Sequence, residues 1–412
     1  MMLCSVQRML SFRKPAVKMG KDSRPELESG IAARAERNTH VLGTRTEVFQ
    51  FLHRELLSGD CLNQGKLRMI TEGIPDVLME MLTIRLNYPQ SVCEHIFSLK
   101  KSRETEGCLY NIRYVNQIMP LIQSSGMYEP YYDYEEHGNE LFPNWMINSR
   151  WAVGLDRDME TGIVIWDQEQ LDYLQKMFEQ RKQKKRSLLI RYNDAVQWMD
   201  QVSDGREEYI KNVKQETDSI EGKKNYYIEY TPCVVHMLPR EMIEKHLLID
   251  EGSRDGLFRA LERRSRQLEC EKNMVRFFSL EGLERMISQG RISGVPDYIY
   301  RPLEPEERLL ALRLYIRWMR EHNVDYYITD SQRLPLAPYT ALYSTASLTN
   351  NEVSICMAVG ESMYCSIHEQ GIAEKIHNFC KLMEKGEFIY EREKTDQIME
   401  RVIQNAENEV KS

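Results

Sequence analysis

The sequence predicts an α+β protein that is predominantly helical. We expect an N-terminal helical bundle, a mixed middle region and a C-terminal module of a small sheet with helices. Apolar residues recur at three- and four-residue spacing through most of the first 126 residues, whereas β-branched and aromatic runs gather in the last hundred. With 412 residues, 42% of them apolar and 29% charged, the chain has the composition of a globular protein of two or three domains.

Changes in composition along the chain suggest where its domains begin and end. Tyr-, Pro- and Gly-containing stretches near residues 128–151 and 290–305 interrupt the regular patterns. We therefore expect a basic, poorly ordered N-terminus over residues 1–28, a helical domain over 29–126, a mixed middle region over 127–289 and a C-terminal α+β module over 290–412. The sequence contains no evident internal repeat.

Short helices separated by glycine-containing turns are expected in the first domain. The spacing predicts helices beginning near Ser29 and over residues 47–57, 64–71 and 76–86. Ser29 is a suitable N-cap, and the helix over 47–57 carries an apolar stripe of Val48, Phe51, Leu52 and Leu56. A compact group of short helices is how a helix-turn-helix presents one helix to the major groove of DNA.

The segment from Gly59 to Gly73, GDCLNQGKLRMITEG, followed by Ile74, Pro75 and a Leu-rich helix, resembles a degenerate helix-turn-helix of the bacterial phage-repressor (Xre) type. In that family the recognition helix ends near a "S-R-I-E-x-G" pattern, and a dipeptide beginning with proline opens the next helix. The resemblance covers about 60 residues, and it implies that the chain is a DNA-binding transcriptional regulator.

The resemblance also indicates which side chains would touch DNA. Near the start of the expected third helix, contacts to bases or phosphates would come from Asn63, Gln64 and Lys66. One helical turn further on, Arg68 would read a base or contact the DNA backbone. Arg45 would add a phosphate contact at the start of the second helix. Each of these side chains could instead be solvated surface.

Periodicity predicts the remaining elements as follows. Helices are expected over 91–100, 108–124, 168–178, 188–199, from 239 onward, over much of 256–288, and over 306–322, 371–384 and 394–408. Strands are expected in a hairpin over 151–167 and over 226–237, 325–329, 340–344, 353–359 and 363–368. The segment 128–151 is expected to be irregular.

Charge and cysteine content narrow the class of protein. The net charge of −8 argues against a chain that coats nucleic acid, but the first 74 residues hold twelve basic and eight acidic side chains, which suits a small DNA-binding head. Nine scattered cysteines, without a Cys-x-x-Cys pair, favour reduced thiols in the cytoplasm. No apolar run is long enough to span a membrane. The basic run 181–186, five cations in six residues, is either a nucleic-acid patch or a solvated face.

Two groups of residues have the chemistry of a site, but their spacing argues against one. Cys365 and His368, with His377 and Cys380, offer zinc ligands, although the gap between the pairs is short and Cys380 joins an apolar helix stripe. Cys233 and His236 would point to opposite faces of an extended chain. We therefore predict no catalytic residues, no metal and no cofactor.

The sequence-based hypothesis is a cytoplasmic transcriptional regulator that binds double-stranded DNA. Its C-terminal body would sense a small-molecule or protein effector or hold a homodimer. Two alternatives remain open: a protein–protein regulatory module that kept a repressor-like fold and lost DNA binding, and an enzyme whose pocket carries no recognisable motif.

Overall fold

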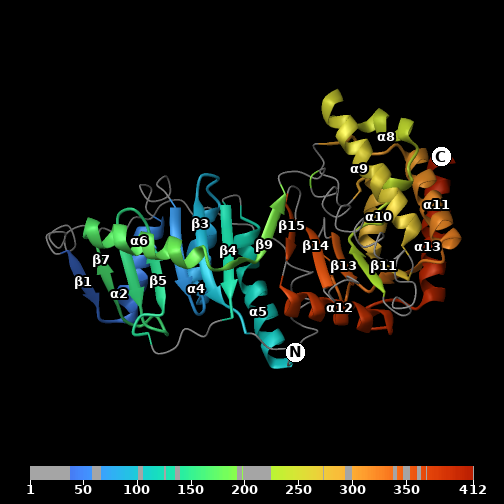
Figure 1. Ribbon diagram of the computed structural model, residues 1–412. Helices are drawn as coiled ribbons and strands as arrows, with labels where there is room; N and C mark the ends of the chain where they lie inside the picture. Colours follow the sequence, from blue (N-terminus) through green and yellow to red (C-terminus); the bar gives the residue numbers. More distant parts are fainter. Residues whose placement is uncertain are drawn as a thin grey trace. The chain divides into compact units, whose positions relative to one another are not determined.

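The computed structural model of the chain comprises two compact units, which meet in sequence between Leu189 and Ile190 (Figure 1). This division lies inside the predicted middle region 127–289. The residues that the structure describes are 38–57, 66–100, 105–124, 127–134, 140–192, 197, 224–271, 273–292, 299–336, 341–346, 353–359, 363–367 and 369–411.

The N-terminal unit is built on one sheet. Its elements are β1 (Thr39–Leu42), α2 (Arg45–Leu57), β2 (Lys66–Thr71), α4 (Asp76–Leu86), β3 (Val92–Ser98), α5 (Thr105–Ile122), β4 (Met127–Asp133), β5 (Asn144–Ile147), β6 (Ala152–Leu155), β7 (Gly162–Ile165), α6 (Gln168–Lys182) and β8 (Arg186–Ser187).

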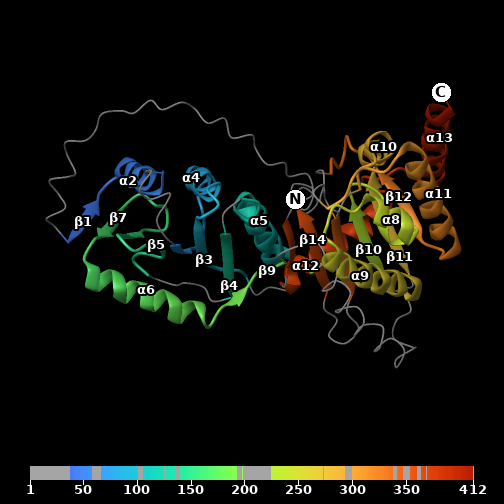
Figure 2. The ribbon, with the colours of Figure 1, turned by 90° about the horizontal axis from the view of Figure 1, so that it is seen from above.

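The strands of this unit form an 8-stranded sheet in the order β1-β7-β6-β5-β2-β3-β4-β8. Strands β2, β3 and β4 are parallel, and the other pairings are antiparallel. Helices α4 and α5 make the crossovers between the parallel strands. Figure 2 shows α2, α4 and α5 on one side of the sheet and α6 on the other, so that helices cover both faces.

The C-terminal unit follows the same plan with longer helices. Its elements are β9 (Leu189–Tyr192), β10 (Asn225–Glu229), the 3-10 helix η2 (Val235–Met237), α8 (Arg240–His246), α9 (Glu251–Cys270), β11 (Met274–Ser279), α10 (Leu280–Gln289), α11 (Pro305–Glu321), β12 (Asp325–Thr329), β13 (Ala341–Ala346), β14 (Val353–Val359), β15 (Met363–Ile367), α12 (Gln370–Glu384) and α13 (Arg392–Lys411).

The two faces of this second sheet pack against different helices. Its strand order is β12-β11-β10-β13-β14-β15-β9, with β10, β11 and β12 parallel. Residues from α9, α10, α11 and α13 form one apolar core with one face. On the other face, the Tyr226 ring lies 5.1 Å from the ring of His377 in α12. Residues two apart on a strand share a face, so the side toward α9 and α11 includes Tyr227, Glu229 and Arg276.

The two units have the same topology. Each has three parallel strands (β4-β3-β2 and β12-β11-β10), followed by three antiparallel strands (β5-β6-β7 and β13-β14-β15), and each sheet has the first strand of its unit beside the last of these. In both units a later segment of the chain pairs antiparallel with the outermost parallel strand. Strand β8 pairs with β4, and Ile389 makes an antiparallel bridge to Thr329 of β12. The two units therefore repeat one fold, although the sequence contains no evident repeat.

The expectation of a predominantly helical protein is wrong, because both units are mixed α/β structures around large sheets. Two predicted helices are strands at the centre of the first sheet. Residues expected in the helix 64–71 form β2, and those expected in 91–100 form β3. Most residues of these strands are buried, so their apolar residues do not alternate, and the spacing of Leu67 and Ile70, or of Val92 and Ile96, resembles that of a helix.

Other expectations are confirmed. The amphipathic segments near 47–57, 76–86, 108–124 and 306–322 are α2, α4, α5 and α11, and the hairpin expected over 151–167 is formed by β6 and β7. The segment 128–151, expected to be irregular, instead contains β4 and β5. In the part of the chain that the structure describes, no helix is long and apolar enough to cross a membrane.

Candidate functional site

The residues expected to contact DNA do not lie together on one helix. Arg45 is the first residue of α2, and its exposed guanidinium lies 5.6 Å from the ring centroid of Phe49. Lys66 and Arg68 lie on β2, so the predicted recognition helix does not exist at these residues. Asn63 and Gln64 lie outside the described residues.

Lys66 and Arg68 instead belong to an ion-pair network that joins α6 to the sheet. Its centre is Glu94 of β3, whose side chain is 1% exposed. The Glu94 Oε1 atom lies 2.9 Å from Lys66 Nζ and 2.6 Å from Lys182 Nζ. Arg68 Nε lies 3.1 Å from the Glu179 Oε1 atom of α6. Two carboxylates thus compensate much of this positive charge, and the network holds α6 against the sheet.

The basic run 181–186 is also engaged in ion pairs. Arg181 Nη2 lies 3.1 Å from Glu140 Oε1, and Lys185 pairs with Asp133. With Lys182 bound to Glu94, three of the five cations have carboxylate partners. The run therefore differs from the free nucleic-acid patch that its sequence allowed.

A second charged cluster lies in the interior of the C-terminal unit. Glu229 ends β10, and Arg276 lies on the neighbouring strand β11, with exposed fractions of 2% and 1%. The Arg276 Nη1 atom is 3.5 Å from Glu229 Oε2. Burial raises the pKa of the Glu229 carboxyl, while the charges of Arg276 and Arg264 act to lower it. The parallel pairing of β10 with β11 positions this ion pair.

A second arginine enters the cluster from α9. Arg264 is 8% exposed, and its guanidinium lies 5.5 Å from the ring centroid of Tyr227 and 5.3 Å from that of Tyr343. The Arg276 guanidinium lies 4.9 Å from the Tyr227 centroid and 5.4 Å from that of Trp318. Ring faces attract cations, so these aromatic side chains help to stabilise two guanidinium groups away from water.

The polar atoms of this cluster are not all satisfied. Among the described residues, Glu229 is the ion-pair partner of Arg276, and Arg264 forms no ion pair. Within the same described part, the buried atoms Arg276 Nε, Arg264 Nη1 and His236 Nε2 have no hydrogen-bond partner. Leaving a buried donor unpaired costs about 1–3 kcal/mol, and native structures seldom do so. We call Glu229, Arg264 and Arg276 the arginine cluster.

Cys233 and His236 border the arginine cluster, and the expectation that their side chains point to opposite faces is wrong. The chain turns into η2 instead of continuing as a strand, and this brings Cys233 Sγ to 3.8 Å from His236 Nδ1. Burial raises the pKa of the Cys233 thiol to about 12. Burial, together with the charges of Arg276 and Arg264, lowers the pKa of His236. A neutral thiol beside a neutral imidazole is not an activated nucleophile.

The residues considered for zinc have other roles. Cys365 and Cys380 are buried cysteines, and His377 Nδ1 lies 3.2 Å from the Ser344 hydroxyl. His368 lies outside the described residues. No group of three or more His, Cys, Asp or Glu side chains among the described residues could hold a metal ion.

The arginine cluster was missed in the sequence, although it leaves a signal there. Arg276 interrupts the apolar strand MVRFFS, and Glu229 ends the run NYYIE. A charged residue within an apolar strand is rarely buried unless it is paired. Such interruptions in neighbouring strands could have identified the pair. Arg264 could not be identified in this way, because it is one of several arginines on α9.

Comparisons with known proteins assign neither a family nor a function. No family model matches the chain, and no curated protein matches it. Solved structures give weak likenesses. One is to TrmBL2, an archaeal chromatin protein with a novel mode of DNA binding, with 12% identity and a TM-score of 0.24. The matched region covers 39% of this chain and 57% of the TrmBL2 chain. Polyphosphate kinase from Porphyromonas gingivalis has 13% identity and a TM-score of 0.25, covering 84% and 50%.

A third likeness is to phosphatidylserine synthase from Haemophilus influenzae Rd KW20, with 8% identity, a TM-score of 0.23 and coverage of 90% of this chain and 94% of that one. The chain spans 57% and 50% of the first two structures. At these TM-scores none of the three likenesses carries an argument about function.

Proposed function

We propose that the C-terminal unit is a sensing body that binds a small anion, and that the arginine cluster is its binding site. One observation carries this proposal: of two buried guanidinium groups, only that of Arg276 pairs with the Glu229 carboxylate, and each retains a buried N–H without a partner among the described residues. An uncompensated charge in the interior is costly, and an anion bound between Arg264 and Arg276 would compensate it.

The charge of the cluster favours a carboxylate as the anion. With Glu229 ionised, the two guanidinium groups leave an excess of one positive charge. A carboxylate carries one negative charge, and its two oxygens match the planar donors of arginine. A phosphate group would exceed the available charge. The neutral state of Cys233 and His236 makes this a proposal of binding, without covalent chemistry.

Isothermal titration of the full chain with sodium butanoate, at an ionic strength held constant with sodium chloride, tests the proposal. We expect saturable binding. In Arg264→Met the affinity should fall tenfold or more, because a hydrogen bond to a charged group contributes about 1.5–3 kcal/mol. Arg259→Met is the matched control, because Arg259 is exposed on the same helix, and it should bind as the unmodified chain does.

Two outcomes would contradict anion binding at this site. One is the absence of butanoate binding at every concentration at which sodium chloride alone gives no heat signal. The other is an equal loss of affinity in Arg264→Met and Arg259→Met, which would indicate a general charge effect.

DNA binding stays a prediction from the sequence, and the structure suggests a better variant for testing it. Because Arg68 pairs with Glu179 of α6, its replacement would perturb the fold as well as any DNA contact. Arg45 is exposed and can be replaced with less disturbance. We expect affinity for random double-stranded DNA to fall steeply with salt and to weaken in Arg45→Ala. Absence of binding at low salt would refute this half of the hypothesis.

A further inference from the structure

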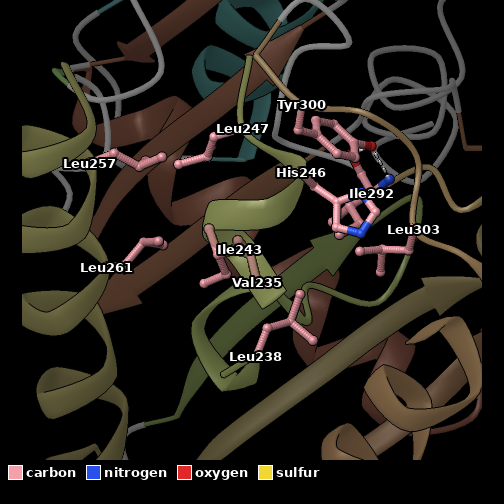
Figure 3. A pocket seen from close by; sticks show the side chains of 10 residues that line it. All are labelled: Val235, Leu238, Ile243, His246, Leu247, Leu257, Leu261, Ile292, Tyr300 and Leu303. Carbon is pink, nitrogen blue, oxygen red and sulfur yellow. Dashed lines mark hydrogen bonds between the residues drawn. The ribbon is translucent and has the colours of Figure 1, made fainter. Parts of the chain in front are cut away.

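A small apolar cavity lies in the C-terminal unit. Its volume is about 40 Å³, and most of its lining is aliphatic, including Val235, Leu238, Ile243, Leu257 and Leu261. Figure 3 shows these side chains converging from η2 and its flanking residue, from α8 and from α9. The cavity is much smaller than the cavity of about 150 Å³ that accepts benzene in another protein.

The polar residues around the cavity have hydrogen-bond partners of their own. His246 Nδ1 lies 3.1 Å from the carbonyl oxygen of Arg301, and His246 Nε2 lies 2.6 Å from Glu307 Oε2. The hydroxyl of Tyr300 accepts a hydrogen bond from the backbone N–H of Ile292 at 2.5 Å (Figure 3). These contacts leave the cavity suited to an apolar group.

Helix α9 connects the cavity with the arginine cluster. Leu257 and Leu261 line the cavity, and Arg264 follows Leu261 by three residues. Residues spaced by four and then three positions lie along one face of a helix. Arg264 therefore lies about one helical turn beyond the cavity wall, along the same side of α9.

The segment around η2 makes a second connection. Val235 and Leu238 line the cavity, and His236 lies between them in sequence. Its Nδ1 atom is near Cys233 Sγ, and its ring centroid is 5.8 Å from that of Trp318, which also packs on Arg276. Cys233, Val235 and His236 are partly exposed, so this segment lies between both features and solvent.

From this juxtaposition we infer that the ligand of the arginine cluster is a short-chain aliphatic carboxylate. Its carboxylate binds between Arg264 and Arg276, and its alkyl group fills the cavity lined by Val235 and Leu261. The inference rests on the proposed function and adds the ligand's apolar part. The volume of about 40 Å³ favours a short alkyl chain over an aromatic ring.

Titration of the full chain with acetate, propanoate, butanoate, hexanoate and benzoate, each at the same ionic strength, tests this inference. We expect the affinity to rise about fourfold for each added methylene until the cavity is full, and then to fall. Benzoate should bind more weakly than the best aliphatic acid. The variants Leu261→Ala and Val235→Ala enlarge the cavity, and each should move the optimum to a longer chain; the partly exposed Val235 is the milder change.

The results separate this inference from the proposed function. If acetate binds in an Arg264-dependent way but chain length has no effect on affinity, anion binding stands and the alkyl site is refuted. An optimum that stays at the same acid in both enlarged variants refutes it as well. If none of the carboxylates binds, the proposed function and the inference fail together.

Discussion

The two units place different chemistry at the same position of the same fold. Thr71 ends β2 and Glu229 ends β10, each on the parallel strand that borders the antiparallel part of its sheet. On the neighbouring strands, Thr71 pairs with Phe97 and Glu229 pairs with Phe278. His95 and Arg276 each lie two residues before these partners. Both pairs are buried on the side of the sheet that faces the crossover helices, so they are equivalent positions.

At this position the N-terminal unit has a closed network of neutral hydrogen-bonding groups. His95 Nε2 lies 2.7 Å from the Thr71 hydroxyl, and His95 Nδ1 lies 2.7 Å from the hydroxyl of Tyr128. The Tyr114 hydroxyl is 3.3 Å from Thr71 Oγ1. Burial lowers the pKa of His95 to about 3, which keeps the ring uncharged. Every group in this network has a partner, and it needs no ligand.

The C-terminal unit has charge at that position, and the difference is informative. Arg276, paired with Glu229 and joined by Arg264, leaves donors unsatisfied where the N-terminal unit leaves none in its network. The same topology therefore carries a closed polar network in one unit and, as we propose, an anion-binding site in the other. Which of them forms depends on the side chains at two strand positions and one helix position.

The largest expected effect comes from removing the carboxylate of the charged pair. Glu229→Leu leaves two buried guanidinium groups without an anion, and we expect the free energy of unfolding to fall by about 3–5 kcal/mol. The double variant Glu229→Leu/Arg276→Met should recover much of this loss, because it also removes a charge. Urea unfolding followed by tryptophan fluorescence measures both. A double variant as unstable as the single one would show that the pair is not the origin of the loss.

A smaller loss of stability is expected when the pH is lowered, because the neutral network contains His95. The folded-state pKa of His95, about 3, lies below the unfolded value of 6.5, so the folded state binds fewer protons between these values and stability falls as the pH drops through this window. From pH 7 to pH 5 this contributes a loss of about 2 kcal/mol. His95→Gln, which cannot titrate, should show a correspondingly smaller slope of unfolding free energy against pH. An unchanged slope would contradict this assignment.

Opening the neutral network at its other end should cost less. Thr71→Val removes the hydroxyl and leaves His95 Nε2 without its partner, for an expected loss of about 1–2 kcal/mol. Thr71→Ser keeps the hydroxyl and serves as the matched control. Thermal unfolding of the two variants side by side measures the difference, and equal stability would mean that the hydrogen bond contributes little.

The smallest effect is expected at Lys66, although the sequence made it a candidate for DNA contact. Its side chain is 37% exposed, and Glu94 keeps its ion pairs with Lys182 and Arg68 when Lys66 is removed. We expect Lys66→Met to change the free energy of unfolding by less than about 1 kcal/mol. A loss as large as that of Glu229→Leu would show that the network around Glu94 resembles the arginine cluster in its energetics.

The sequence predicted elements whose environment leaves a periodic signal. The one-sided helices α2 and α11 have apolar stripes, and they were placed correctly. Strands β2 and β3 are largely buried and therefore have no two-residue alternation, so they were taken for helices, and the repressor-like interpretation of Lys66 and Arg68 followed from that error. The topological repeat could not be predicted, because it depends on strand order.

The candidate site was beyond sequence reasoning for a related reason. Glu229, Arg264 and Arg276 are far apart in the chain and meet only when β10, β11 and α9 pack together. Cys233 and His236 were judged as an extended chain, but η2 folds one toward the other. The spacing of residues along the sequence predicts contacts between side chains only within a single helix or strand.

Hydrogen exchange of the full chain, with and without butanoate, tests most directly the claim that one unit has a binding site where the other has a closed network. A ligand that binds only the folded state slows exchange in the region it stabilises. We predict slower exchange in β10, β11 and α9, and no change in β2, β3 or α5. Unchanged exchange in the C-terminal unit, or an equal change in both units, would contradict it.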